Sequence, residues 1–127
     1  LCADRAIPCV FTSTDLVFDG KAAPYLETDA VCPISIYGEQ KVQAEQGMLS
    51  RYPQTQVCRL PLMFGAATPA AHSFMQPFIQ TLRTGQTLKL FVDEFRTPVI
   101  AVTAAKGLLQ AIAQTGGYLH LGGKERI

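Results

Sequence analysis

The chain alternates between short apolar runs and stretches whose apolar residues recur every three or four positions. Residues 7–12 form a continuous apolar run, which is typical of a parallel strand covered on both faces. Residues 56–60 and 118–121 predict two further strands, and residues 88–92 a shorter one. Residues 99–102 are predicted to form a strand or an extended connection. Strands separated by helical stretches favour an α/β fold with parallel strands and right-handed crossovers.

Helical spacing of apolar residues is found in residues 35–51, 73–83 and 104–114. The first helix is expected to start after Ser35, whose hydroxyl can accept a hydrogen bond from a free backbone N–H. It should stop near Arg51, because the residue before Pro53 disfavours the α region. Thr103 is the expected N-cap of the last helix, and residues 1–5 are expected to finish a helix.

Residues 15–33 form a long stretch without regular period, and loops of that length are usually functional or disordered. Glu27 and Asp29 lie in this stretch, where they could contact substrate hydroxyls or simply form a solvated acidic loop. Residues 68–72 are expected to be a linker.

Composition excludes several classes of function. The net charge of +1 over 127 residues gives no basic surface for nucleic acid, and no apolar stretch approaches the length of about 18–20 residues that spans a bilayer. The four cysteines have no C-x-x-C spacing and there are only two histidines, so no metal site is expected. Unpaired cysteines in apolar runs favour a reduced, cytoplasmic setting.

Tyr37 and Lys41 are the candidate chemical groups, because residues four apart share one face of a helix. A nearby cation favours the phenolate form of a tyrosine, so the pair could donate a proton to a carbonyl oxygen or take one from an alcohol. The alternative is a partly exposed tyrosine beside a solvated lysine, since Y-x-x-x-K is a common pattern.

A series of further motifs surrounds this pair. They are S-T-D-x-V-F-D-G at residues 13–20, E-x-D at 27–29, P-x-x-x-Y-G-x-x-K-x-x-x-E at 33–45, R-L-P-L-M-F-G at 59–65, D-E-F-R-T-P-V at 93–99 and H-L-G-G at 120–123. In this order the motifs resemble the extended short-chain dehydrogenase/reductase family, in its dTDP-4-dehydrorhamnose reductase-like, sugar-nucleotide-binding branch.

The resemblance implies the later part of a Rossmann-like doubly wound parallel sheet with part of a small C-terminal substrate-binding region. Residues 1–65 would be the second half of the NAD(P)-binding domain, and residues 66–127 would combine substrate-binding segments with the final strand and helix. The Gly-rich turn that holds a dinucleotide pyrophosphate in this family is absent from the sequence. The chain is therefore expected to be an internal fragment of a longer protein.

The resemblance also implies a function and roles for individual residues. The function is NAD(P)-dependent reduction of a keto group on a nucleotide-linked sugar, with NADP or NAD as cofactor. Tyr37 would be the general acid, Lys41 would assist it and hold the nicotinamide ribose, and Thr14 would hydrogen-bond the substrate carbonyl. Cofactor contacts are expected from Ser13, Tyr37, Lys41, Leu60 and Pro61, and substrate contacts from Asp15, Val17, Phe18, Met63 and Arg96.

Some interpretations remain open at this point. Arg96 could clamp the substrate diphosphate or pair locally with Asp93 or Glu94. Arg59, inside an apolar strand, should have a carboxylate or carbonyl partner, and His120 is expected to pack in the core. The family also includes non-catalytic dinucleotide-binding regulatory subunits and sugar-nucleotide epimerases or dehydratases. A homodimer or self-association through an exposed strand edge is expected.

Overall fold

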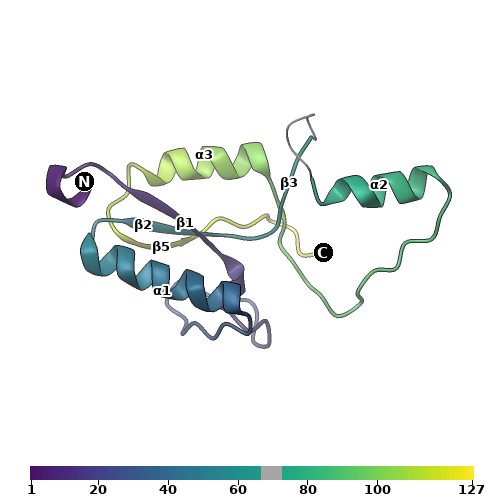
Figure 1. Cartoon of the computed structure of the whole chain (residues 1–127), viewed down its shortest axis with the longest axis horizontal. Helices are drawn as coiled ribbons and strands as arrows, with labels where there is room; N and C mark the ends of the chain where they lie inside the picture. The colour runs from purple at the N-terminus through teal and green to yellow at the C-terminus, as the bar shows by residue number, and fades with distance from the viewer. Residues whose placement is uncertain (67–72) are drawn as a thin grey trace.

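A computed structural model describes residues 1–66 and 73–127. Three parallel strands form a sheet in the order β1 (Val10–Thr14), β2 (Gln56–Leu60) and β5 (Gly117–His120). All residues of the central strand β2 are buried, as expected for a strand covered on both faces. Helix α1 (Ile36–Arg51) lies on one side of the sheet and α3 (Ala101–Ala111) on the other (Figure 1). The predicted α/β class with a parallel sheet is confirmed.

Helix α1 has the bounds that the sequence predicts. The Ser35 hydroxyl accepts a hydrogen bond from the backbone N–H of Gly38 at 3.1 Å, which caps the first turn. The helix ends at Arg51, and Tyr52, the residue before Pro53, takes an extended conformation. The capping hydroxyl and the proline therefore determine both ends of the helix.

Strand β1 starts later than the apolar run predicts. The predicted strand begins at residue 7, but the observed strand begins at Val10. Pro8 has no N–H to donate to a strand ladder, and Ile7 is 43% exposed.

Residues 1–5, which are expected to finish a helix, contain a single 3-10 turn, η1 (Ala3–Arg5).

Strand β1 lies at the edge of the sheet, because β2 is its only partner among residues 1–66 and 73–127. The backbone N–H of Gln56 donates to the carbonyl of Cys9, so alternate residues of β1 face β2. Val10 and Thr12 consequently present their backbone groups to the open side. Self-association through an exposed strand edge is expected from the sequence, and β1 provides such an edge.

Two predictions in the second half of the chain are wrong. Residues 88–92 are not a strand: no partner strand lies beside them in the part of the chain that the structure describes, and Leu90, Phe91 and Val92 are exposed. Helix α3 begins at Ala101 rather than at residue 104, so Thr103 lies inside the helix and does not cap it. The strand β4 (Val99–Ile100) runs directly into α3, which leaves no separate capping turn.

A second, two-stranded sheet consists of β3 (Met63–Phe64) and β4, which the sequence does not predict as a pair. Helix α2 (Met75–Arg83) forms close to its predicted position and projects away from the main sheet (Figure 1). The expected linker at residues 68–72 falls outside the described residues.

The segment that carries Arg96 is held by backbone hydrogen bonds on both sides. The backbone groups of Arg96 and Ile127 exchange two hydrogen bonds of 2.9 Å, and the N–H of Gly123 donates to the carbonyl of Thr97 at 2.9 Å. A Cβ on Gly123 would lie 2.1 Å from the carbonyl oxygen of Pro98, so this close approach requires glycine. Ile127 and Gly123 of the H-L-G-G motif therefore hold the segment that carries Arg96.

Candidate functional site

The candidate site begins at the carboxyl end of β1, where ligands bind in open α/β sheets. The chain continues there into a 3-10 turn, η2 (Asp15–Val17). The hydroxyl of Thr14 accepts the N–H of Leu16 and donates to Oδ1 of Asp15, both at 3.2 Å. The adjacent Ser13 is 6% exposed, and its Oγ has no hydrogen-bond partner among the described residues. Ser13, a cofactor contact that the resemblance implies, thus has a buried hydroxyl without a partner in the described part of the chain.

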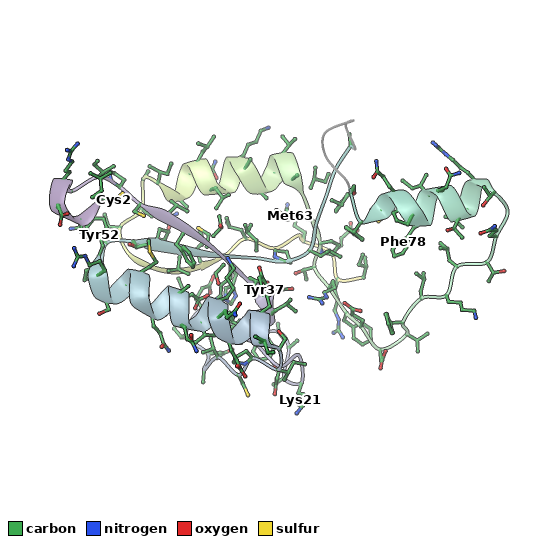
Figure 2. All side chains as sticks on the ribbon, viewed as in Figure 1. Cys2, Lys21, Tyr37, Tyr52, Met63 and Phe78 are labelled. Carbon is green, nitrogen blue, oxygen red and sulfur yellow. The ribbon has the colours of Figure 1, made fainter. Side chains whose placement is uncertain are left out.

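Tyr37 and Lys41 lie on one face of α1, and α1 contacts both β1 and η2. Figure 2 shows Tyr37 on the first turn of the helix, near the end of β1. The Lys41 ammonium is 5.9 Å from the centroid of the Tyr37 ring and donates to the carbonyl oxygen of Thr12 at 3.0 Å. The Tyr37 side chain is 50% exposed, so a ligand can reach it. The phenol, the ammonium and the end of β1 thus form one connected region.

Gly38 explains how the first turn of α1 comes so close to the end of β1. A Cβ at this position would lie 2.4 Å from the carbonyl oxygen of Leu16 in η2 and 2.9 Å from Cβ of Pro33. Glycine is a poor helix former, so its presence in a first turn has a local cost. That cost is offset by contact between the backbone of η2 and the helix turn that carries Tyr37.

We expect Gly38→Ala to displace the start of α1 from η2, because the clash is with backbone atoms that cannot rotate away. The expected result is a loss of stability of about 1–3 kcal/mol, in the range for overpacking, and a loss of any activity that needs Tyr37. Gly47→Ala is the matched control, since no atom lies within 4 Å of the position that a Cβ would take there. That substitution should raise stability by up to about 1 kcal/mol. Urea unfolding of both variants tests the expectation, and equal effects would contradict it.

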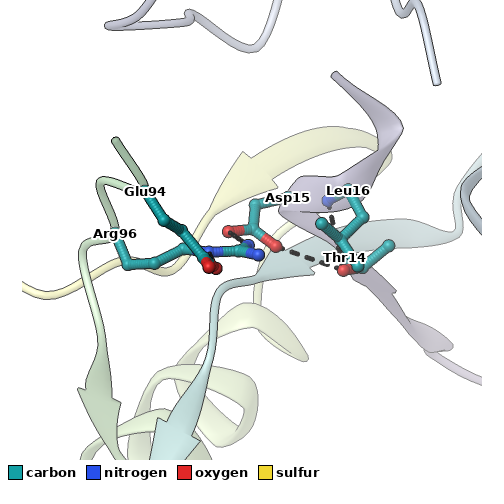
Figure 3. A network of polar contacts seen from close by, with 5 residues as sticks. All are labelled: Thr14, Asp15, Leu16, Glu94 and Arg96. Atoms are coloured by element: carbon teal, nitrogen blue, oxygen red, sulfur yellow. Dashed lines mark hydrogen bonds and ion pairs between the residues drawn. The ribbon is translucent and has the colours of Figure 1, made fainter. Parts of the chain in front are cut away.

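Arg96 connects a distant segment to the end of β1 (Figure 3). Its NH1 group pairs with Oδ2 of Asp15 at 3.1 Å, and its Nε donates to Oε1 of Glu94 at 2.8 Å. The pairing with Glu94 that the sequence leaves open is therefore present, and Asp15 is a second partner. Burial acts to lower the pKa of the Arg96 guanidinium, but the two carboxylates together outweigh burial and raise this pKa. Two predicted substrate contacts, Asp15 and Arg96, thus touch each other.

Arg59 has the carboxylate partner that the sequence predicts. Its Nε and NH2 groups bind the two oxygens of Glu45 at 3.0 and 2.8 Å, and the two side chains are 3% and 1% exposed. The guanidinium lies over the rings of Phe18 and Tyr118, 5.1 and 4.3 Å from their centroids. Glu45 is the last residue of the Y-x-x-x-K-x-x-x-E pattern, so this pair ties the face of α1 that carries Lys41 to β2.

Glu27 has a structural contact that its sequence position does not reveal. Its carboxylate accepts the backbone N–H of His120 at 3.0 Å, which attaches the irregular loop to the end of β5. That hydrogen bond lowers the pKa of the Glu27 carboxyl. His120 packs edge-on against Phe18 at 5.6 Å, as expected for a packing histidine, and burial lowers its pKa. Asp29 accepts the N–H of Leu26 at 2.7 Å, a local turn contact.

The lowered pKa of His120 predicts that stability falls as the pH drops from about 7 to 5. The unfolded chain binds a proton near pH 6.5, whereas the folded chain resists it, so unfolding becomes easier below that pH. The slope for one proton is at most about 1.4 kcal/mol per pH unit. Urea midpoints at pH 7 and 5.5 should differ less in His120→Gln than in the parent. An identical dependence in the two proteins would contradict this expectation.

The remaining residues that are predicted to contact cofactor or substrate differ in how far they are exposed to solvent. Val17 is fully buried, so its side chain packs in the interior instead of lining a pocket wall. Phe18 is 8% exposed and stacks on Tyr25 with ring centroids 4.3 Å apart. Leu60 is 6% exposed, Pro61 is buried, and Met63 in β3 is 45% exposed.

Among the residues that the structure describes, no cluster of three or more metal-ligating side chains and no helix able to span a membrane is found.

Comparison with known proteins gives the family. The model of the RmlD substrate binding domain matches residues 1–127. A probable low-salt glycan biosynthesis reductase of Haloferax volcanii is 34% identical over 100% of this chain and 44% of its own length. Methionine adenosyltransferase 2 subunit beta of Danio rerio is 34% identical over 60% of this chain and 24% of its own length. The chain thus spans less than half the length of these relatives.

A solved structure has the same fold. The dTDP-4-dehydrorhamnose reductase of Bacillus anthracis, in complex with NADP, superposes with a TM-score of 0.83 at 22% identity. The match covers 92% of this chain and 41% of that one. The family model matches the whole of this chain, residues 1–127, and the solved structure has the same fold. The chain therefore belongs to the RmlD substrate binding domain family.

Proposed function

We propose that the full-length protein carrying this sequence reduces a keto group on a nucleotide-linked sugar, with NADPH or NADH as hydride donor. The observation that carries the proposal is the placement of Tyr37 and Lys41 on one face of α1, against the end of β1. The name of one relative supports it, since the Haloferax volcanii protein is called a probable reductase. The chain covers less than half of that relative, so the activity of the whole protein is inferred from this part.

The chemistry requires a hydride at the carbonyl carbon and a proton at the carbonyl oxygen. A bound nicotinamide cofactor would supply the hydride. Tyr37, whose phenol is half-exposed, would donate the proton, and the Lys41 ammonium would favour the phenolate that this donation leaves behind. Thr14 would hydrogen-bond the substrate oxygen from the end of β1. Its hydroxyl donates a hydrogen bond to Asp15 in the structure, so donation to a substrate requires the hydroxyl to rotate.

The described residues suit the nicotinamide ribose half of the cofactor. Among the described residues, Ser13 has a buried Oγ without a partner, and Lys41 makes one hydrogen bond, to the carbonyl of Thr12. These groups would hold the nicotinamide ribose together with Tyr37, beside the backbone of Leu60 and Pro61. No Gly-rich strand–turn–helix occurs in the sequence, so these residues offer no cradle for the pyrophosphate. We therefore expect the 127-residue chain alone to bind NADPH weakly and not to turn over substrate.

The substrate would lie between the end of β1 and the segment that carries Arg96. Arg96 would bind the diphosphate, with Asp15 beside it, while Phe18 and Met63 would form apolar contacts to the sugar. Assay of the full-length protein on nucleotide-linked keto sugars and on the matching free sugars tests this proposal. We expect NADPH oxidation only with the nucleotide-linked compounds. Equal rates with free keto sugars would contradict the assigned substrate class.

A non-catalytic regulatory subunit is the second candidate function. It is favoured by one relative, which is named as the beta subunit of a methionine adenosyltransferase. The motif residues could then support dinucleotide binding without turnover. Tight NADPH binding by the full-length protein with no hydride transfer to any keto sugar would favour this candidate over the reductase.

We also propose that the open edge of β1 is covered by self-association or by a further segment of the full-length protein, in a cytoplasmic setting. Unpaired strand edges tend to pair with other chains, and the outward backbone groups of Val10 are available for this. Sedimentation of the 127-residue chain should show dimers or larger species at micromolar concentration. A stable monomer would exclude self-association through this edge.

A further inference from the structure

Arg96 binds two carboxylates that differ in how they are held. Asp15 lies 81 residues away in sequence, in the turn that follows β1, and its second oxygen accepts the hydroxyl of Thr14. Glu94 lies two residues from Arg96 on the same irregular segment, and no other partner of its carboxylate is found among the described residues. The exposed fractions are 34% for Asp15 and 46% for Glu94. Asp15 is therefore the better anchored of the two.

The charges of this cluster conflict with a simple anion clamp. One guanidinium and two carboxylates leave an excess of one negative charge, which repels a diphosphate. A planar guanidinium binds phosphate best when its fork offers two parallel N–H groups. Here the Nε group is on Glu94 and NH1 is on Asp15. The Nε atom has a single N–H, so an anion that takes the fork formed by Nε and NH2 must displace Glu94.

We propose that Asp15 is the fixed anchor of Arg96, and that Glu94 is an exchangeable carboxylate occupying the position that the anionic group of a ligand takes. The inference deepens the proposed function, because it rests on Arg96 as the residue that receives the diphosphate. Asp15 keeps the guanidinium at the end of β1, near the hydroxyl of Thr14. Glu94 competes with the ligand and so sets the affinity for diphosphates.

Three substitutions that each remove one negative charge separate this arrangement from a general charge effect. Glu94→Gln frees the Nε side of Arg96 and should tighten anion binding. Asp15→Asn removes the anchor and should weaken binding, although the local charge becomes more favourable. Asp93→Asn is the matched control, since Asp93 is exposed, adjoins Glu94 and makes no ion pair in the part of the chain that is described. That substitution should change affinity less than twofold.

The experiment is calorimetric titration of the 127-residue chain and its variants with inorganic pyrophosphate at fixed ionic strength. We expect Glu94→Gln to lower the dissociation constant by about tenfold, Asp15→Asn to raise it by at least threefold, and Arg96→Ala to abolish the gain of Glu94→Gln. Thermal unfolding of each variant shows whether the chain remains folded. As an independent readout, the ¹⁵Nε resonance of Arg96 should shift on pyrophosphate addition in the parent chain.

Several results would overturn the inference. Equal tightening by all three neutral variants would show a general charge effect, and no change in any variant would show that Glu94 does not compete. Absence of pyrophosphate binding even in Glu94→Gln would show that Arg96 receives no anion. None of these readouts depends on hydride transfer. Failure of the reductase activity in the full-length protein, with the opposite effects of Glu94→Gln and Asp15→Asn retained, would leave this inference intact and refute the proposed function alone.

Discussion

Tyr37→Phe in the full-length protein is expected to lower turnover of a nucleotide-linked keto sugar by about 10²–10⁴-fold, the usual contribution of a general acid. The substitution removes only the phenolic oxygen, so the ring remains beside Lys41 and the helix keeps its contacts with η2. Affinity for NADPH should change far less than turnover. Steady-state kinetics and a dinucleotide titration measure the two effects separately.

Tyr52→Phe provides the matched control for loss of a phenolic hydroxyl. Tyr52 follows the last turn of the same helix, and its hydroxyl donates to the side chain of Gln54 at 3.0 Å on the surface. Turnover in this variant should stay within about twofold of the parent. Turnover close to the parent value in Tyr37→Phe as well would show that another group donates the proton.

Breaking the Arg59–Glu45 pair is expected to have the largest effect on stability. Removing one partner leaves the other charge buried, so Arg59→Met and Glu45→Leu should each lower the free energy of unfolding by about 3–5 kcal/mol. Such a loss is a large fraction of the total stability of a typical domain, which is about 5–15 kcal/mol. Urea unfolding of the single variants gives the two values.

The double variant distinguishes the cost of an unpaired charge from the loss of favourable packing. Arg59→Met combined with Glu45→Leu leaves neither charge of the pair buried, and the methionine side chain can still pack against Phe18 and Tyr118. We expect its stability to lie within about 1–2 kcal/mol of the parent protein. Additive losses in the double variant would mean that the guanidinium stabilises the fold through its stacking with these rings.

Local signals in the sequence predict the helix that carries Tyr37 and Lys41 well. Ser35 and Pro53 act within one turn of the helix ends, so their effects do not depend on the rest of the fold. The start of α3 is harder to predict, because it depends on a contact that is distant in sequence. Thr103 looks like a cap, but pairing of β4 with β3 places the start of α3 at Ala101. The strand expected at residues 88–92 has the right residues but no partner strand in the described part of the chain.

The site depends on contacts that sequence spacing does not reveal. The sequence indicates that Arg59 needs a carboxylate, yet the partner could have been any acidic residue; Glu45 is recognisable only because it lies one turn beyond Lys41 on the same helix face. The bond from Glu27 to His120 spans 93 residues, and the pair of Arg96 with Asp15 spans 81. A signal was available for Gly38, because a glycine in a first helical turn has a cost that a close backbone contact explains.

The most direct test of the central claim is the transfer of deuterium from NADPH labelled at C4 of the nicotinamide to dTDP-4-dehydrorhamnose by the full-length protein. The two faces of C4 should be labelled in separate samples, because the hydride can leave from either face. The proposed reduction predicts one deuterium on the former carbonyl carbon of the sugar, from one of the two labelled cofactors, with one equivalent of NADP⁺ formed. Unchanged sugar, or an isomerised sugar without deuterium and without net cofactor oxidation, would contradict the proposed reduction by the full-length protein.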